Sequence, residues 1–276
     1  MFDDSEYSDE LEVALEAAEA AGEVIDEYAD GEAEVQGSKS SPGDIYTEAD
    51  IRAQDRIVEV ISESFPDDGF LAEEEMEYQE EGKAGRRWVI DPVDGTTNFQ
   101  KGLDYFCTSI AFEVKGEARV GVVYSPESGL SSLFLAVQGS GAYRSSSPGS
   151  LEDLQSLELS QVEDRRKALV FSRVSDFDGE HRDQKELWSE LAEEGSAVRY
   201  MSSGALEISK VASGRGEAFM SHTESRWDFA AAELIAREAG AFVEVQDSKV
   251  SGKYRVLVSN PDLKSFVKGL SVRFYE

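Results

Sequence analysis

The chain has 276 residues, enough for one large domain or two modest ones with a hydrophobic core. Hydrophobic residues make up 40% of it, which excludes a disordered or fibrous chain. Its 57 Asp and Glu residues outnumber 27 Lys and Arg residues, and the formal net charge is −30. A surface this acidic repels nucleic acid and anionic membranes, so we expect neither as a partner.

The acidic residues are scattered along the chain, which indicates solubility in concentrated salt. At 1 M salt the Debye length is about 3 Å, so self-repulsion is screened. We therefore expect a halophilic protein. The N-terminal stretch lacks a signal-peptide pattern, and no apolar run approaches the roughly 18 residues of a membrane span. The expected location is the cytoplasm.

The only cysteine, Cys107, excludes an internal disulfide bond. It lies in a strand-like apolar run, where a buried, inert thiol is more common than a nucleophile. The two histidines, His181 and His222, lie in polar, loop-like sequence. A histidine-based zinc site is therefore not expected.

Helical periodicity predicts a helix over residues 8–30, with Ser8 as its N-cap. It predicts a second helix over residues 48–65, which Pro66 ends. Apolar, strand-like segments joined by glycine-containing hairpins follow. These segments cover residues 86–91, 108–126 and 132–144.

A polar stretch with proline and glycine, residues 145–161, is the predicted boundary between two halves of the chain, residues 1–150 and 151–276. The second half mixes strands and helices, which indicates an α/β fold. Its predicted strands are residues 167–174, 216–222 and 254–260, the last of them closing the chain. Its predicted helices are residues 183–195, 204–214 and 227–241.

The stretch RRWVIDPVDGTTNF ends an apolar strand in two aspartates, Asp91 and Asp94. Like charges at a buried strand end are unfavourable unless a cation lies between them, because each ion loses hydration. Pro92 holds Asp91 in extended geometry, and the Asp-Gly pair at 94–95 favours a turn that starts a helix. Backbone N–H groups at the start of a helix form a natural phosphate site.

The two carboxylates and the Val93 carbonyl are hard oxygen ligands, the kind that Mg²⁺ prefers. The motif alone leaves a second interpretation open, a polar turn without a ligand. The other acidic segments also have ordinary explanations. Residues 69–82 read as a solvated loop, and Asp50 and Asp228 read as caps at helix starts.

Taken together, DPVDGTTNF at 91–99 and WDFAAAELIAREAGA at 227–241 resemble the paired signatures of the inositol monophosphatase family in order and spacing. The segments 38–50 and 70–75 fall where that family has its Lys loop and its Gly-Glu-Glu segment. The resemblance extends from about Leu11 to Val258. It implies the family's fold, an alternating α-β-α-β-α layered sandwich of the sugar phosphatase type with two sheets.

The resemblance implies a metal site. Glu73, Asp91 and the Val93 carbonyl would bind one Mg²⁺ ion. Asp91, Asp94 and Asp228 would bind a second. Two ions of this kind activate water and stabilise the leaving oxygen of a phosphate ester.

The resemblance also implies roles around these metals. Thr96 and Glu73 would orient the attacking water and, with Asp94, are the implied catalytic residues. Asp50 would order the loop that carries Lys39 over a third, weaker metal site. The implied substrate contacts are Asp94, Gly95, Thr96, Gly204, Ala205 and Arg173.

The implied reaction is hydrolysis of a phosphomonoester by metal-activated water, with two or three Mg²⁺ ions and no phosphoenzyme. The expected substrate is a small sugar or polyol phosphate, such as inositol 1-phosphate, fructose 1,6-bisphosphate or both. The expected partner is this small molecule alone. The assembly that the resemblance implies is a homodimer.

One departure from the inositol-directed members bears on the substrate. Seven residues before the Asp of the WD signature, where many of them carry an acid, this chain has Ser221, and Glu224 is out of register. The departure leaves room for the archaeal-type branch, whose members hydrolyse both inositol 1-phosphate and fructose 1,6-bisphosphate. Arg173 would then face a second phosphate, unless it forms an ordinary surface ion pair. The sequence leaves open whether Ser221 or Glu224 replaces the missing acid.

Two other functions stay open. One is a 3′-phosphoadenosine 5′-phosphate phosphatase, although those relatives usually carry Lys-Glu where this chain has Thr97 and Asn98. The other is a non-catalytic relative that binds sugar phosphates. A binding role would not need the pair that orients water, which makes it the weaker alternative.

Overall fold

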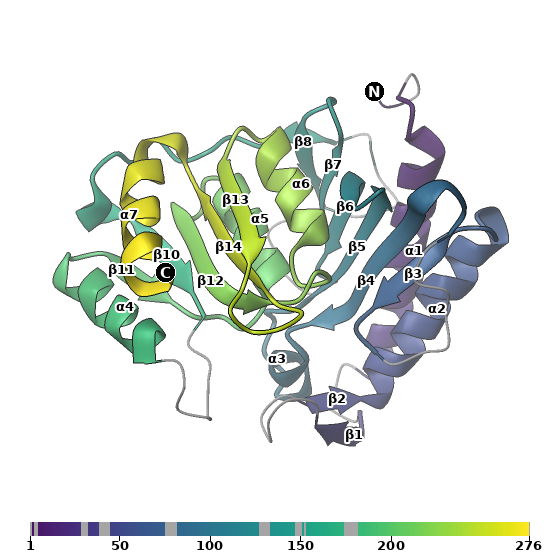
Figure 1. The fold of residues 1–276 in the computed structure, drawn as a ribbon. Coiled ribbons are helices and arrows are strands. Elements are labelled where there is room, and N and C mark those ends of the chain that lie inside the picture. Colours follow the sequence, from purple (N-terminus) through teal and green to yellow (C-terminus); the bar gives the residue numbers. More distant parts are fainter. Residues whose placement is uncertain are drawn as a thin grey trace.

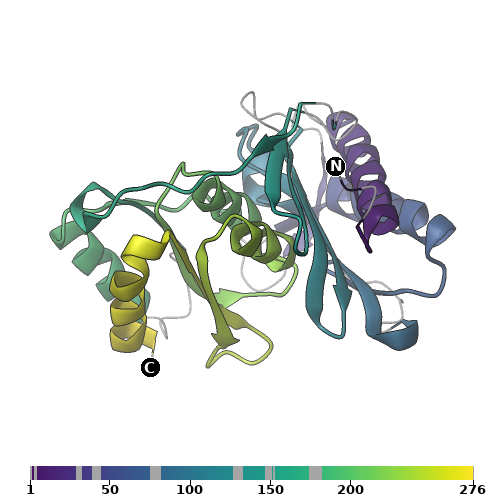
Figure 2. The same cartoon turned by 90° about the horizontal axis from the view of Figure 1, so that it is seen from above.

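The structure is a computed structural model that describes residues 2, 5–28, 33–38, 45–74, 82–126, 133–146, 151, 153–173 and 182–275. Its helices and sheets alternate in layers, which Figure 2 shows from above. Two helices cover a seven-stranded sheet, two more separate it from a five-stranded sheet, and a third pair covers the far face. The expected α-β-α-β-α sandwich is confirmed. The three helix pairs are α1 (Ser8–Asp26) with α2 (Glu48–Ser64), α5 (Gly204–Ala212) with α6 (Ala230–Glu238), and α4 (Arg182–Glu193) with α7 (Lys264–Tyr275).

The larger sheet has the strand order β3-β4-β5-β6-β7-β8-β9. β3 runs parallel to β4, and each later pair of neighbours is antiparallel. The strands are β3 (Gly69–Ala72), β4 (Arg86–Asp94), β5 (Cys107–Val114), β6 (Glu117–Tyr124), β7 (Leu133–Val137), β8 (Ala142–Ser145) and β9 (Gln155–Ser156).

The smaller sheet has the order β11-β10-β12-β14-β13, with β10 parallel to both of its neighbours. Its strands are β10 (Leu169–Ser172), β11 (Ala197–Arg199), β12 (Ala218–Glu224), β13 (Phe242–Asp247) and β14 (Tyr254–Ser259). A separate antiparallel pair leads into α2 (Figure 1). That pair and the short helices are β1 (Val35–Ser38), β2 (Ile45–Thr47), α3 (Thr96–Gln100), η1 (Lys83–Gly85), η2 (Arg165–Lys167) and η3 (Pro261–Leu263).

Three hydrophobic clusters fill the spaces between the layers. In α1, fully buried alanines recur at three- and four-residue steps, and their short side chains let the helix pack against α2 and the sheet. Larger side chains fill the other spaces, each worth about 1.5–3 kcal/mol when fully buried. Examples are Trp88 and Phe112 in the first cluster, Phe134 and Phe229 in the second, and Leu187 and Leu191 in the third.

Most predicted helices and strands are present, but their ends differ and several further elements were not predicted. Ser8 is not the N-cap of α1, because Tyr7 precedes the helix and makes no side-chain cap bond. The prediction that residues 254–260 close the regular structure is wrong. α7 follows, and its apolar Val267 and Leu270 pack into the third cluster. β13 and the short strands β1, β2, β9 and β11 were also not predicted. The explanation of residues 69–82 as a solvated loop is wrong at its start, because Gly69–Ala72 form β3 and Phe70 is buried in the first cluster.

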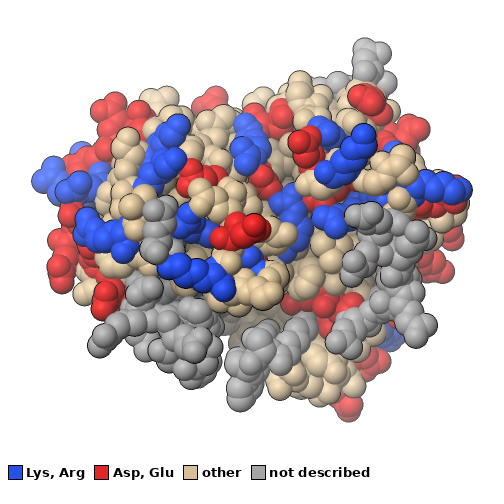
Figure 3. All heavy atoms as spheres, in the orientation of Figure 1, with Lys and Arg blue, Asp and Glu red and all other residues tan. Residues whose placement is uncertain are grey.

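The surface carries both signs of charge in uneven distribution. On the face drawn in Figure 3, Lys and Arg side chains gather across the middle, with carboxylates among them and towards the edges. Within the described part of the chain, no helix is long and apolar enough to cross a membrane.

Gly121 tests the packing of β6 against α6. A Cβ at this buried position would lie 2.5 Å from the Ala231 carbonyl oxygen, which is backbone and cannot turn aside. We expect Gly121→Ala to lower the free energy of unfolding by about 1–3 kcal/mol, because it overpacks the space between the layers. Urea denaturation measures this loss.

Gly269→Ala is the matched control. Gly269 lies on the exposed side of α7, with nothing within 4 Å of an added Cβ, so this change should keep or raise stability. Equal losses of unfolding free energy in Gly121→Ala and Gly269→Ala would contradict the close packing of β6 on α6.

Candidate active site

The candidate site forms where β4 ends and α3 begins, beside the start of α5 (Figure 1). On a regular strand, Asp91 and Asp94 would point to opposite faces, since they are three residues apart. The pairing of β4 with β5 shifts between them, at Pro92 and Val93. Both aspartates are buried, and each charge acts on the other.

Gly95 makes the turn after β4. Its φ of 101° lies in the left-handed region, and a Cβ would lie 3.0 Å from the Tyr105 carbonyl oxygen and 3.2 Å from that of Ser202. Glycine alone suits both the conformation and the close approach. The predicted turn at 94–95 and the helix after it are confirmed, because α3 starts at Thr96.

The Asp94 carboxylate caps the N-terminus of α5. It accepts hydrogen bonds from the Ser203 hydroxyl at 2.8 Å and from the N–H groups of Ala205 and Gly204 at 2.8 and 3.2 Å. The structure therefore brings Gly204 and Ala205 to Asp94, about 110 residues away in the chain. The buried Cys107 thiol lies 3.7 Å from the same carboxylate, and burial raises its pKa, as expected for an inert thiol.

Asp50 connects the start of α2 to Thr96. The Thr96 hydroxyl lies 2.8 Å from one Asp50 oxygen and 3.1 Å from the Val93 carbonyl oxygen. The other Asp50 oxygen accepts the N–H and hydroxyl of Thr47 at 2.8 and 2.5 Å, which completes a capping box. Asp50 is the third residue of α2, the position that the acidic partner takes in a capping box. Burial raises its pKa, although the bonds from Thr47 and Thr96 lower it.

Glu73 follows β3, whose end lies beside that of β4. Its N–H donates to the Ile90 carbonyl at 3.1 Å, and its side chain hydrogen-bonds to that of Asp91. The next residue, Glu74, is held by two backbone hydrogen bonds of 3.0 Å with the Gln54 side chain. The Gln54 side chain on α2 therefore holds the backbone that follows β3 in place.

Asp228 lies just before α6, and its carboxylate accepts the Ser225 N–H at 2.6 Å. It also shares a hydrogen bond with the side chain of Glu224. Carboxyl side chains contact each other at two places in the site, Glu73 with Asp91 and Glu224 with Asp228. Without a cation, such a contact raises the pKa of Asp91.

Electrostatics explains why protons stay in this site. Burial raises the pKa of Asp91 well above its usual range, and the charges of Glu73, Asp94 and Asp228 raise it further. Burial and the charge of Glu224 likewise raise the pKa of Asp228. Burial raises the pKa of Asp94 to about 7, against the lowering effect of the bonds from Ser203 and Ala205. These carboxyls need a cation to ionise together.

The donor set suits Mg²⁺ in its chemistry. It offers four carboxylates and the Val93 carbonyl, all oxygen ligands, from Glu73, Asp91, Asp94 and Asp228. Within the described residues, no three acidic, histidine or cysteine side chains converge into a ready-made metal cage. A cation would have to displace the protons of these carboxyls and draw the side chains together. Lys39, expected on a loop over a third metal, lies outside the described residues.

Arg173 and Glu224 form a pair at the edge of the site. The Arg173 guanidinium lies 3.4 Å from the Glu224 carboxylate, and their side chains are 31% and 4% exposed. Burial alone would raise the pKa of Glu224, but Arg173 and the bonds from Ser221 and Asp228 lower it. Because Glu224 is buried, the Arg173–Glu224 pair is not the ordinary surface ion pair that the sequence analysis left open.

The pairing of β12 with β14 shifts between Ser221 and Glu224. A Cβ added to Gly204 would lie 3.4 Å from a Glu224 carboxylate oxygen, so Glu224 reaches the start of α5. Ser221 is fully buried behind it.

Sequence reasoning missed the residues that position the loop before α5. The Asn98 amide donates to the Tyr105 and Met201 carbonyls at 2.7 and 2.6 Å. The buried Glu207 carboxylate accepts the Met201 N–H at 2.6 Å, and burial raises its pKa. Nothing in the local sequence identifies these partners, because the contacts span up to about 100 residues.

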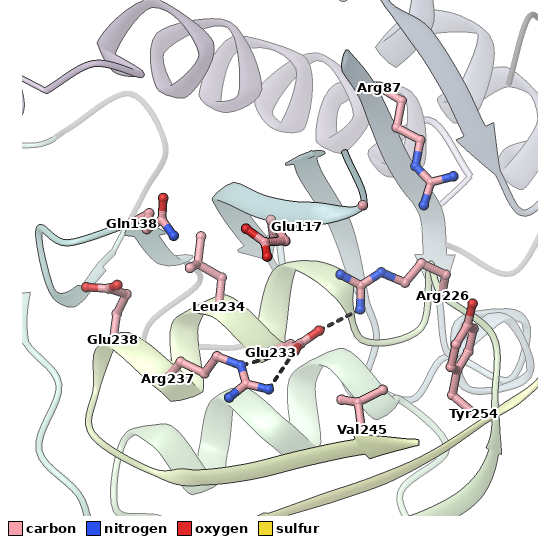
Figure 4. A pocket seen from close by; sticks show the side chains of 12 residues that line it. Arg87, Glu117, Gln138, Arg226, Glu233, Leu234, Arg237, Glu238, Val245 and Tyr254 are labelled. Carbon is pink, nitrogen blue, oxygen red and sulfur yellow. Dashed lines mark hydrogen bonds and ion pairs between the residues drawn. The ribbon is translucent and has the colours of Figure 1, made fainter. Parts of the chain in front are cut away.

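A separate pocket of roughly 620 Å³ lies beside α6 (Figure 4). Its arginines are neutralised: Arg226 pairs with Glu113 and Glu233, Arg237 pairs with Glu233, and Arg87 pairs with Glu113. None of the candidate site residues lines it, so it is distinct from the candidate site. The lining residues are Arg87, Gly116, Glu117, Ala118, Gln138, Arg226, Glu233, Leu234, Arg237, Glu238, Val245 and Tyr254.

The raised pKa of Asp94 predicts a pH dependence of stability in the metal-free protein. In the unfolded chain an Asp titrates near pH 4, whereas Asp94 titrates at about 7 in the fold. The folded state therefore holds more protons between these values, and stability should fall as pH rises from about 4 to 7. Melting temperatures measured in EDTA and constant high salt should show this slope. Asp94→Asn should flatten it, and an unchanged slope would contradict the assignment.

Comparisons with known proteins identify the family of the chain. The model of the Inositol monophosphatase family matches residues 6–270. The "Nus factor SuhB" of Pasteurella multocida is 36% identical over 238 residues, 84% of each chain. The "Inositol-1-monophosphatase" of Mesorhizobium japonicum is 33% identical over 249 residues, 86% of this chain and 85% of the relative. The inositol monophosphatase structure from Anabaena superposes with a TM-score of 0.81 at 27% identity, covering 98% of each chain. The chain belongs to the inositol monophosphatase family.

Proposed function

We propose that the protein is a Mg²⁺-dependent phosphomonoesterase acting on inositol 1-phosphate, fructose 1,6-bisphosphate or both. Membership of the family supports a phosphatase. The observation that carries the proposal is the convergence of carboxyls at the ends of β3 and β4 and before α6, where Asp91 and Asp94 are buried and the pKa values of Asp91, Asp94 and Asp228 are raised. Such a group is costly for the fold unless a cation neutralises it.

Glu73, Asp91, the Val93 carbonyl, Asp94 and Asp228 would hold two Mg²⁺ ions. When bound, the ions supply the positive charge that activates water and neutralises the phosphate and the leaving oxygen. The loop that carries Lys39, ordered through Asp50, would complete a third site. The protein's own task is to hold these oxygen atoms in place before the substrate arrives.

Thr96 would position the attacking water. When its hydroxyl donates to Asp50, at 2.8 Å, its lone pairs are left to accept a hydrogen bond from water. The Glu73 carboxylate, at the end of the neighbouring strand, would accept the other hydrogen of that water. Asp50 is then a positioning residue, because it fixes the direction of the Thr96 proton.

The substrate would lie between the turn after β4 and the start of α5. The N–H groups of Gly95 and Thr96 would bind phosphate oxygens. Those of Gly204 and Ala205 donate to Asp94, so they would hold that carboxylate at the edge of the substrate site. Glu224 would replace the acid missing at Ser221 and accept a sugar hydroxyl, and Arg173 beside it would face a second phosphate.

Relatives named Nus factor raise a second candidate function, since that name does not describe an enzyme. The name agrees with the non-catalytic alternative, in which the protein would bind Mg²⁺ or a sugar phosphate without turnover. A third candidate, a 3′-phosphoadenosine 5′-phosphate phosphatase, differs only in substrate. The homodimer, the cytoplasmic location and the requirement for high salt stay predictions.

Phosphate release in high-salt buffer with Mg²⁺ tests the proposal on inositol 1-phosphate, fructose 1,6-bisphosphate and 3′-phosphoadenosine 5′-phosphate. We expect turnover of one or both of the first two substrates. Thr96→Val and Asp94→Asn should each reduce kcat by about 100-fold or more, because they remove a water-positioning group and a metal ligand. Thr97→Val, one residue on and exposed, is the matched control and should keep its activity. Bound Mg²⁺ without turnover of any substrate would favour the binding role.

Arg173 tests the choice of substrate. A charge-assisted contact to a second phosphate is worth about 1.5–3 kcal/mol, so Arg173→Ala should raise KM for fructose 1,6-bisphosphate by about tenfold or more. KM for inositol 1-phosphate should change much less. Arg173→Lys, which keeps the charge beside Glu224, separates substrate binding from loss of the ion pair. Equal changes in KM for both substrates would contradict the assignment.

A further inference from the structure

We propose that the C-terminal end of α5 carries a second anion site, formed by Lys210, Arg215 and Arg144, that binds a phosphate-type oxyanion. Asp94 caps the N-terminal end of the same helix. A helix of nine residues is about 13 Å long, so the two sites lie at opposite ends of α5.

The three cations come from two distant parts of the chain. Lys210 lies in the last turn of α5, and the Arg215 N–H donates to its carbonyl at 2.9 Å. Arg144 lies on β8 directly opposite Phe134 of β7. The Lys210 ammonium lies 5.1 Å from the centre of the Phe134 ring, which places it beside Arg144.

This cluster is unusual because the described residues provide no carboxylate for it. Many other arginines are paired with carboxylates: Arg86, for example, contacts Asp68 at 2.6 Å and Glu10 at 3.0 Å. Arg144 instead donates to the neutral Gln155 side chain at 2.8 and 3.1 Å. In a chain with 57 acidic and 27 basic residues, three neighbouring cations to which the described residues supply no acid are not explained by composition.

The mutual repulsion of the cluster is visible at Lys210. Burial, and with it the charges of Arg215 and Arg144, lowers its pKa to about 8. The C-terminal dipole of α5 and the Phe134 ring each favour one cation, but they do not account for three. A bound oxyanion would neutralise the cluster, and guanidinium groups are well shaped to hold one.

Inorganic phosphate is the probe, used in EDTA and high potassium chloride. Without Mg²⁺ the candidate active site lacks the ions that would hold phosphate, so binding at the cluster remains. Isothermal titration calorimetry should show saturable phosphate binding to the wild type. The affinity for phosphate should fall tenfold or more in the double variant that carries Lys210→Met and Arg144→Gln. Asp94→Asn should bind phosphate as the wild type does. Lys264→Met is the matched control, because exposed Lys264 also lies over a phenylalanine ring, that of Phe242 at 4.9 Å.

A second measurement needs no variant of the cluster. Phosphate should slow the acetylation of Lys210 in the wild type, read by mass spectrometry, and should leave Lys264 unaffected. Inositol 1-phosphate compared with inorganic phosphate distinguishes an esterified ligand from the free ion. Phosphate binding that survives in the double variant, or equal protection of both lysines, would overturn the proposal. The proposal would also be overturned if added chloride slowed the acetylation of Lys210 as much as phosphate does.

Discussion

The hydrogen bonds of the Asp94 carboxylate connect the end of β4, in the candidate site, to the start of α5. α5 packs against α6, and both helices fill the space between the two sheets. The position of Asp94 therefore depends on the packing of the middle layer, and the middle layer depends on the cap that Asp94 provides. A side chain held by three donors has little freedom to move, which suits a residue that must meet a metal in fixed geometry.

The same arrangement concentrates negative charge inside the fold. Burial raises the pKa of Asp91, Asp94 and Asp228, and the charges of neighbouring carboxyls raise the pKa of Asp91 and Asp228 further. A structural core would avoid these groups, because apolar residues of similar size would stabilise it more. Their presence together, beside a threonine whose hydroxyl is fixed by Asp50, is the physical argument for a metal site and for the phosphatase assignment.

Much of the architecture could be predicted from the sequence, because periodicity and turn residues mark most elements. The short motif at 91–99 was sufficient to predict the strand end, the turn at Gly95 and α3. Contacts over long distances could not be predicted. Glu224 reaches the site only because the pairing of β12 with β14 shifts, and Ser203 meets Asp94 only through the packing of α5. Helix α7 was missed because its weak apolar pattern follows a convincing final strand.

The most direct test of the account is the titration of Mg²⁺ into the metal-free protein at pH 7, in buffers with different ionisation enthalpies. If the cation replaces protons held by buried carboxyls, binding must release protons, and the measured enthalpy must change with the buffer. We predict Mg²⁺ binding with proton release that Asp94→Asn reduces. Binding without proton release, or no binding at all, would contradict the claim that these carboxyls are held for a metal.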